Sequence, residues 1–556
     1  MIKISNHMYN LGKRIIIVIS ALIIFYLTIL AGFSTTFIAA NEMAYLVKDS
    51  FLLNILFLIV FLIVLLKIVY PCEFVRRIIY KVNNDVVFYH KCRKIVLISY
   101  SVVLVCIILV LQKNARGDQL DIFNVASEWL EEDYSSLEQG GYLDFYPNQI
   151  GIVLILYFCS HLFGVYNYTL FHAVNMIALL LIIKAFCDFS DLLGNNRSTS
   201  LAIMLFSTLF FPPALYVTFA YGTIIGLCFS IYATKSIVII NKTNNWLMII
   251  PAVFCSFMAV VIKSNYLIFL IGNIVLVMML ILKKYNAKLM ILLPVLVIVL
   301  LFNSKVIRGI ASVSTGMEIG TGMSSYSWIA MGLMENDHGY NGWWNNYNGE
   351  SYVNNSFNRE LQADECKVYI RDRLRYFWSN KGEALKYFAG KNASQWNIPD
   401  FQGSWINRVM PSDLQYPEWI IFLETERGAC WINRILNYWH FIILCGVVLY
   451  LILGEKDDVA LVFFTVFIGG FIFHSFWEAK GQYTLPYFML LLPMSAQGLI
   501  EFLKVLRQKK FRKLAILVVL AIAILIGRLG QIKTFHDVFV RVEDTDKYYE
   551  ILQEQQ

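Results

Sequence analysis

The sequence predicts an all-α polytopic membrane protein with about thirteen transmembrane helices, its N-terminus inside and its C-terminus outside. Of the 556 residues, 58% are hydrophobic and only 15% are charged, whereas soluble proteins carry about 25% charged residues. Apolar runs of about 20 residues recur along the chain, which is the length of a membrane-spanning helix. The alternation typical of barrel strands is missing, so we interpret the runs as helices with internal backbone hydrogen bonds.

The expected spans run from near the N-terminus almost to the C-terminus. They lie at about 15–38, 51–70, 95–112, 168–187, 199–216, 221–240, 246–262, 265–282, 288–303, 435–453, 459–477, 483–503 and 513–530. The apolar segment 149–163 is shorter, and at about 1.5 Å per residue it barely reaches across the hydrocarbon. We interpret it as a helix that dips into the outer surface. If it were a full span, Arg197, Lys242 and Lys283 would lie outside, against the rule that basic loop residues face the cytoplasm.

Charged loops predict the orientation. Lys13 and Arg14 precede the first span, and the loop 71–94 is rich in Lys and Arg. The loop 113–148 carries eight acidic and two basic residues. Basic loops face the cytoplasm, so 71–94 is expected inside and 113–148 outside. These short basic loops explain the net charge of +7, which therefore predicts no nucleic-acid partner.

The spans divide the chain into four parts. These are an N-terminal two-helix hairpin with a basic cytoplasmic loop (1–94), a transmembrane core that includes the outside loop 113–164 (95–303), a large extracytoplasmic region (304–434), and C-terminal helices with an outside tail (435–556). Long ordered loops are usually functional, so the two outside regions are the places to seek a site. A multi-pass location in the cell membrane is expected.

Cysteine and histidine usage gives little sign of a metal site. The ten cysteines form no Cys-x-x-Cys pair, and the histidines are dispersed. Cys366 and Cys430 share the second outside region, where they can pair or stay free as small buried residues. The charged stretch 359–391 between them is expected to form soluble helices.

The acidic outside loop begins with the most informative stretch, 116–121, which contains Asp118 and Asp121. Their spacing places both carboxylates on one face of a helix. A carboxylate just outside the membrane can take a proton from an acceptor hydroxyl, as a general base does. Two carboxylates can instead bind a divalent cation. A solvated acidic loop has the same composition, so spacing alone leaves these alternatives open.

Further polar residues are expected at the same outer boundary. Residues 146–149 precede the dipping helix and offer donors and acceptors at its mouth. Lys263 lies in a tight join between two spans, where its ammonium can hold a lipid phosphate or snorkel to the surface. Glu478 and Lys480 join two later spans. The Trp-, Tyr- and Asn-rich stretch 340–347 suits either a sugar or an interfacial aromatic belt.

In order and sidedness, these motifs resemble the GT-C superfamily of polytopic glycosyltransferases over about residues 95–500. The nearest pattern is that of bacterial relatives of protein mannosyltransferases and of lipid A aminoarabinose transferase. The matching motifs are Asp118-Gln119, Tyr146-Pro147, Leu162-Phe163-Gly164, Pro212-Pro213 before Tyr221-Gly222, Lys263-Ser264-Asn265, Ser327 to Leu333, and Trp477-Glu478-Ala479-Lys480. Two positions depart from the family pattern. Gln119 replaces the second acid of the first-loop pair, and Thr223 stands where many members have an acid after Tyr-Gly.

The resemblance implies transfer of a sugar from a polyprenyl-phosphate donor to an extracytoplasmic acceptor, which is a cell-wall or surface glycan, a teichoic acid or a protein. It implies an inverting displacement with Asp118 as base and Asp121 as helper, and it requires no cofactor. A divalent cation is not indicated. The residues expected at the donor and its phosphate are Tyr146, Asn148, Gln149, Lys263, Asn265, Glu478 and Lys480. Those expected to contact the acceptor or sugar are Trp328, Tyr340 and Trp343.

Two other functions fit the same class of protein. A polysaccharide polymerase or ligase would use a lipid-diphosphate glycan and outside arginines, for which Arg371, Arg373 and Arg375 are candidates. A lipid-sugar flippase would place ionisable groups near the bilayer midplane and often contains internal repeats. The charges here collect at the outer boundary and no repeat is visible, so the sequence favours a transferase.

Overall fold

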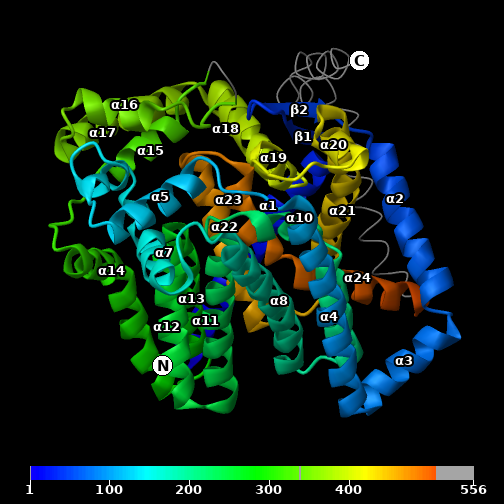
Figure 1. Cartoon of the computed structure of the whole chain (residues 1–556). Helices are drawn as coiled ribbons and strands as arrows, with labels where there is room; N and C mark the ends of the chain where they lie inside the picture. The colour runs from blue at the N-terminus through cyan, green and yellow to red at the C-terminus, as the bar shows by residue number, and fades with distance from the viewer. Residues whose placement is uncertain (1, 337–339, 509–556) are drawn as a thin grey trace.

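The computed structural model describes residues 2–336 and 340–508, and helices make up most of them (Figure 1). Within these residues, nine helices are long and apolar enough to cross a membrane, and three bent pairs pass the same test. This confirms the expected class, a mostly helical multi-pass membrane protein whose surface suits a lipid bilayer. The expected span 513–530 lies outside the described residues, so the count of thirteen stays a prediction.

The long helices follow the expected apolar runs. They are α1 (Ile2–Phe33), α2 with its π-helical continuation (Phe51–Val69), α4 (Val86–Leu111), α8 (Tyr168–Leu192), α11 (Thr223–Thr243), α13 (Leu267–Lys283), α14 (Ala287–Thr315), α21 (Glu426–Leu453) and α22 (Asp458–Phe476). A short helix, α3 (Glu73–Asn84), links α2 to α4, and α12 (Ile249–Ile262) precedes α13.

A proline near the start of the second segment accompanies each of the three bends. Pro212 begins α10 (Pro212–Leu215), which with its following turn is bent by 52° from α9 (Arg197–Thr208). α23 (Gly481–Met489) and α24 (Leu492–Arg507) differ by 51°. The segment that ends with α6 (Tyr142–Phe145) meets the one that contains α7 (Ile150–Phe163) at 101°. Proline lacks the N–H that a continuous helix needs, which explains a break at 212.

The helix ends lie at two opposite ends of the bundle. At one end, the start of α1 meets the end of α13 and the start of α22. There Tyr9 Oη donates to Asp458 at 2.8 Å, and Lys283 Nζ lies 2.7 Å from the same carboxylate. Lys13, expected inside, also lies at this end, where it donates to the carbonyl of Lys456 at 2.7 Å. Which end faces the cytoplasm stays a prediction.

Short helices gather at the other end, where they form a layer over the long ones (Figure 1). The layer contains α5 (Asp118–Leu130), α15 (Ser325–Gly332), α16 (Tyr347–Asn354), α17 (Arg359–Ser379), α18 (Lys381–Trp396), α19 (Gly403–Val409) and α20 (Glu418–Glu424). α17 and α18 are the helices expected in the charged stretch 359–391. The two regions that the sequence predicts to lie outside therefore meet in one layer.

The N-terminal segment corrects the expectation of an all-α chain and of a first span at 15–38. α1 ends at Phe33, and an antiparallel hairpin follows, formed by β1 (Ser34–Ile38) and β2 (Ala44–Lys48). β-branched residues favour strands, but the sequence of β1 continues the apolar run of α1, and hydropathy therefore predicts a helix there. Thr36 N donates to the carbonyl of Asn397 at 2.9 Å, which ties the hairpin to the layer.

The two N-terminal helices pack against different parts of the bundle, and the expected division of the chain into four parts stays a prediction. α1 packs against α13, α21 and α22 within the bundle, whereas α2 packs mainly on α21 at its edge (Figure 1). Cys366 and Cys430, whose pairing the sequence leaves open, are both free. Cys366 faces the hydroxyl of Tyr347, with Sγ and Oη 3.8 Å apart, and Cys430 packs against the β-hairpin instead.

A glycine fixes α7 against α12, and its substitution gives a first prediction. A Cβ added at Gly151 would lie 2.1 Å from the carbonyl oxygen of Val261, a backbone atom that cannot move aside. Gly151→Ala is therefore expected to lower the free energy of unfolding by about 1–3 kcal/mol, the usual cost of overpacking. Thermal unfolding of the purified protein measures this. Gly309→Ala on α14 is the control, because a Cβ there meets open space; equal melting of the two variants would contradict the packing.

Candidate functional site

A cavity of about 490 Å³ opens between the long helices and the layer of short ones. Eight separate segments of the chain meet around it. Its polar and aromatic lining includes Asn41, Glu42, Arg116, Asp118, Gln119, Tyr146, Asn148, Gln149, Tyr221, Trp328, Trp344, Asn348, Trp405, Glu478, Lys480, Gln482 and Tyr483. Small-molecule sites usually have volumes of about 300–1,000 Å³, so this cavity has the size of a binding site.

Asp118 stands at the edge of the cavity, on the first turn of α5. The preceding Gly117 has φ 55° and ψ −138°, a conformation that costs other residues strain. Asp118 is exposed, and its Oδ2 accepts a hydrogen bond from Tyr221 Oη at 2.9 Å. Gln149 donates in turn to Tyr221 Oη. The positive end of the helix dipole also lies at this position.

Gln119 has a different role from its neighbour. Its Oε1 accepts from the backbone N–H of Ala220 at 2.8 Å, which docks the start of α5 onto the turn before α11. Asp121 shares a helix face with Asp118, as its spacing predicts, but it does not line the cavity. Burial and, after it, the charge of Asp118 raise the pKa of Asp121. The structure thus brings one carboxylate of the pair to the cavity.

Lys263 lies behind the cavity wall. It caps α12 and donates to Thr223 Oγ1 at 3.0 Å. Its Nζ lies 4.5 Å from the ring centre of Tyr221 and 5.7 Å from that of Tyr483, both of which line the cavity. Burial lowers the pKa of Lys263 to about 7, although Asp118 opposes the shift. Thr223 is therefore the acceptor for this lysine.

Lys480 and two carboxylates form a charged group on the cavity wall. Lys480 Nζ lies 3.2 Å from Glu42 and 3.8 Å from Glu478. Burial raises the pKa of Glu478 to about 7, against the effect of Lys480. The pKa of Lys480 is raised because its carboxylate partners outweigh burial. The ammonium thus stays charged across the neutral range.

Glu42 is one functional candidate that was not predicted from the sequence. It lies in the turn of the β-hairpin with φ 64°, and its side chain reaches Lys480 from a segment that was expected to connect two spans. Asn41 and Glu42 interrupt two runs of strand-forming residues, which is a hairpin signal. The predicted topology already places the connection 39–50 outside, so a hairpin over 34–48 would have made this acid a candidate for the site.

The aromatic candidates divide into two groups. Trp328 lines the cavity and stacks on Trp477, with ring centres 5.8 Å apart and an angle of 3°. Tyr340 and Trp343 do not line it. Tyr340 Oη accepts from the N–H of Leu46 at 3.1 Å, and buried Trp343 donates to Ser394 at 2.8 Å. Their expected sugar contact is therefore not supported by their positions.

Trp344, which belongs to the aromatic stretch 340–347, and Trp405 line the cavity instead, although neither was expected individually to contact the sugar. Trp344 is 49% exposed, and Trp405 Nε1 donates to the carbonyl of Ala40 in the hairpin turn at 3.2 Å. Trp343 is buried while its neighbour Trp344 lines the cavity, a difference that sequence periodicity does not reveal. Asn265, expected at the donor phosphate, is half-buried after α12 and does not line the cavity.

Among residues 2–336 and 340–508, no group of three or more His, Cys, Asp or Glu side chains is placed to hold a metal ion. Comparison with known proteins adds no relative: no family model, curated protein or solved structure matches the chain.

Proposed function

We propose that this protein is a membrane glycosyltransferase that moves a sugar from a polyprenyl-phosphate donor to an extracytoplasmic acceptor, with Asp118 as the general base. One observation carries the proposal: exposed Asp118 and charged Lys480 face the same 490 Å³ cavity at the end of the helix bundle. A lipid-linked donor can enter such a site from the membrane, and an acceptor from the water. The GT-C resemblance of the sequence supports the same reaction.

The reaction would be a single displacement. Asp118 takes the proton of the acceptor hydroxyl, and the hydroxyl oxygen forms a bond to the anomeric carbon. The bond from that carbon to the phosphate oxygen breaks, and polyprenyl phosphate leaves with the electron pair. The anomeric centre is inverted. Because Tyr221 already donates to Oδ2 of Asp118, the carboxylate is held in place for this proton transfer.

Positive charge would stabilise the departing phosphate. Lys480 reaches the cavity directly, and Lys263 acts through the aromatic wall of Tyr221 and Tyr483. Fixed charges in a site of low dielectric stabilise a developing anion without reorganising. Trp328 and Trp344 offer aromatic planes on which a sugar ring can stack.

The polymerase or ligase alternative receives less support from the arginines on α17. Arg373 pairs with Glu335 at 2.6 Å and lies over the ring of Phe377. Arg371 and Arg375 both pair with Asp372. None of the three lines the cavity, so a lipid-diphosphate glycan in the cavity would not meet them.

The proposal is tested in the source organism by glycan analysis of the cell envelope. A deletion strain is expected to lose one sugar from an envelope glycan or glycoprotein, and the wild-type gene is expected to restore it. An unchanged sugar composition in the deletion strain, measured across polysaccharide, teichoic-acid and protein fractions, would refute the function.

The two adjacent tryptophans give a matched prediction. Trp344→Ala is expected to lower kcat/KM about tenfold by removing a stacking surface, with unchanged thermal unfolding. Trp343→Ala removes a buried side chain and is expected to cost about 3–5 kcal/mol of stability. Transfer assays and thermal unfolding of both variants measure the contrast. Loss of activity without loss of stability in Trp343→Ala would contradict the assignment of the two roles.

The pH dependence gives a further prediction. The pKa of Lys263 is lowered to about 7, so its charge is present below that pH and is lost above it. Glu478, with its pKa raised to about 7, gains negative charge over the same range. Both changes make the binding of the donor phosphate and its departure less favourable, so kcat/KM is expected to fall as pH rises through about 7. Lys263→Arg keeps its charge and is expected to weaken the fall, and an unchanged profile would contradict the role of Lys263.

A further inference from the structure

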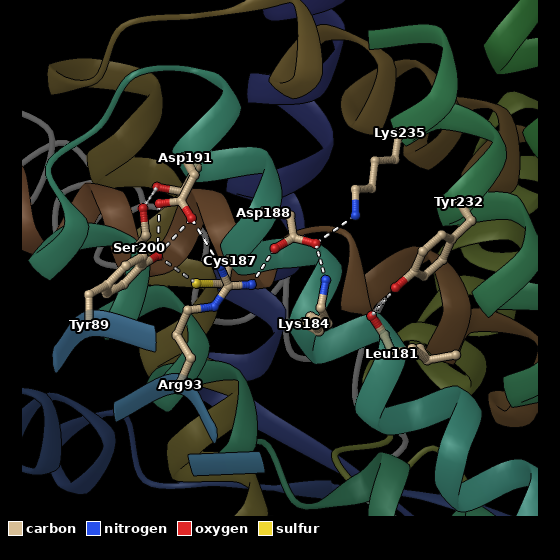
Figure 2. Close-up of polar contacts among 11 residues, drawn as sticks. Tyr89, Arg93, Leu181, Lys184, Cys187, Asp188, Asp191, Ser200, Tyr232 and Lys235 are labelled. Atoms are coloured by element: carbon tan, nitrogen blue, oxygen red, sulfur yellow. Dashed lines mark hydrogen bonds and ion pairs between the residues drawn. The ribbon is translucent and has the colours of Figure 1, made fainter. Parts of the chain in front are cut away.

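A second charged cluster lies away from the cavity and joins three long helices (Figure 2). It consists of Arg93 on α4, Lys184, Asp188 and Asp191 on α8, and Lys235 on α11; we call it the Asp188 cluster. Lys184 and Lys235 lie 2.7 and 2.6 Å from Oδ2 of Asp188, and Arg93 contacts Oδ1. Arg93 also lies 3.2 Å from Asp191. Nothing in the proposed transfer reaction uses these residues.

The cluster lies near the opposite end of the bundle from the cavity. α8 begins at the cavity end, where Asn175 donates to the carbonyl of Phe219 at 2.9 Å, and it runs away from there to Leu192. Lys184 and Lys235 each precede the end of their helix by eight residues, about 12 Å at 1.5 Å per residue. Both ammonium groups therefore belong to membrane-spanning helices, where ionisable side chains are costly and usually functional.

The charges of the cluster do not balance. Three cations face two carboxylates, which leaves one excess positive charge. Because Lys184 and Lys235 contact the same oxygen, their nitrogens lie within about twice that contact distance of each other. An ammonium has three N–H donors, and within the described residues each of these two gives one of them to an oxygen. Donors remain for a second anion beside Asp188.

One edge of the cluster is open to the surface. The side chain of Lys184 is 41% exposed, whereas those of Arg93, Asp188 and Lys235 are 11–16% exposed. Ile177 and Leu181, which precede Lys184 on the same face of α8, are exposed apolar residues. This face suits lipid chains. An anion can thus reach the two ammonium groups from the membrane surface at this end of the bundle.

We propose that Lys184 and Lys235 together bind a phosphate group, supplied by the head group of an anionic phospholipid in the leaflet opposite the cavity or by a soluble phosphate. Long lysine side chains extend toward the head-group region from positions within a span, and basic pockets between helices bind lipid phosphates. The bound phosphate neutralises the excess charge and links α8 to α11.

Lipid retention by the full-length protein tests this site without any assay of activity. Wild-type protein in mixed phosphatidylglycerol and phosphatidylcholine nanodiscs is extracted and its bound lipid is counted by native mass spectrometry. Retention of phosphatidylglycerol is expected to fall about thirtyfold in Lys184→Gln/Lys235→Gln. Each lysine near a membrane surface contributes about 1 kcal/mol to the binding of an anionic lipid, which is somewhat less than tenfold in affinity. Lys242→Gln is the control, because Lys242 is exposed on α11, the helix of Lys235, and lies outside the cluster.

A parallel titration with inorganic phosphate in detergent separates the two sources. Binding of either probe that the double variant loses and Lys242→Gln keeps supports the site. The proposal would be overturned if wild type and double variant retained phosphatidylglycerol equally. It would also be overturned if the wild type neither preferred phosphatidylglycerol over phosphatidylcholine nor bound inorganic phosphate. The cluster would then be only a set of internal ion pairs. If the double variant does not fold, Lys184→Gln alone is used, since its side chain is the most exposed.

Discussion

Asp118→Asn is expected to lower sugar transfer by about 10²–10⁴-fold, the range that a positioned general base contributes. Asparagine keeps an oxygen that can accept the hydrogen bond from Tyr221 Oη, so the cavity is expected to stay intact. What the variant lacks is a group that can take the proton of the acceptor hydroxyl. Transfer from a labelled donor measures the loss, and thermal unfolding shows that the fold is unchanged.

Asp121→Asn is the matched control for that variant. Asp121 lies one turn further along α5 and does not line the cavity. Its substitution is expected to change transfer by less than about tenfold, because it acts on Asp118 only through charge. Equal losses in the two variants would show that α5 supplies an acidic surface and that Asp118 is not the base.

Lys480→Met is expected to lower kcat by about 10²–10³-fold, the effect of removing one fixed group that stabilises a developing anion. Lys480 is the lysine that lines the cavity directly, and its pKa is raised by its carboxylate neighbours. Its removal also leaves Glu42 and Glu478 without the ammonium between them. Negative charge would then face the departing phosphate.

Two further variants distinguish the charge of Lys480 from its packing. Lys480→Arg keeps the charge and is expected to recover most of the activity. Lys386→Met, at an exposed lysine on α18 that pairs with Glu383, is expected to be neutral. Full activity in Lys480→Met with intact folding would remove Lys480 from the proposed chemistry.

The helical membrane fold could be predicted because each span is a long apolar run that a bilayer forces into a helix. The same reasoning failed at Ser34–Ile38, where the apolar run continues but the chain becomes a strand. Hydropathy does not distinguish a buried strand from a helix end. The hairpin forms because it pairs with itself and binds Asn397 and Tyr340, contacts that distant residues supply.

The candidate site could be predicted in part for a similar reason. Asp118, Lys263 and Lys480 are polar residues at the ends of apolar runs, so their common boundary was visible in the sequence. Contacts across the cavity were not. Glu42 reaches Lys480 only through the hairpin turn. Trp344, not Trp343, faces the cavity because of the turn that holds both, and no spacing rule indicates this choice.

Donor turnover by the purified protein tests the central claim most directly. Wild-type protein and Asp118→Asn are incubated in lipid with radiolabelled polyprenyl-monophosphate sugars, and in parallel with polyprenyl-diphosphate glycans, together with an envelope extract as acceptor. Wild-type protein is expected to move the label from the monophosphate donor to the acceptor and to release polyprenyl phosphate, while Asp118→Asn is not. Turnover of the diphosphate glycans alone, or equal turnover by the two proteins, would contradict it.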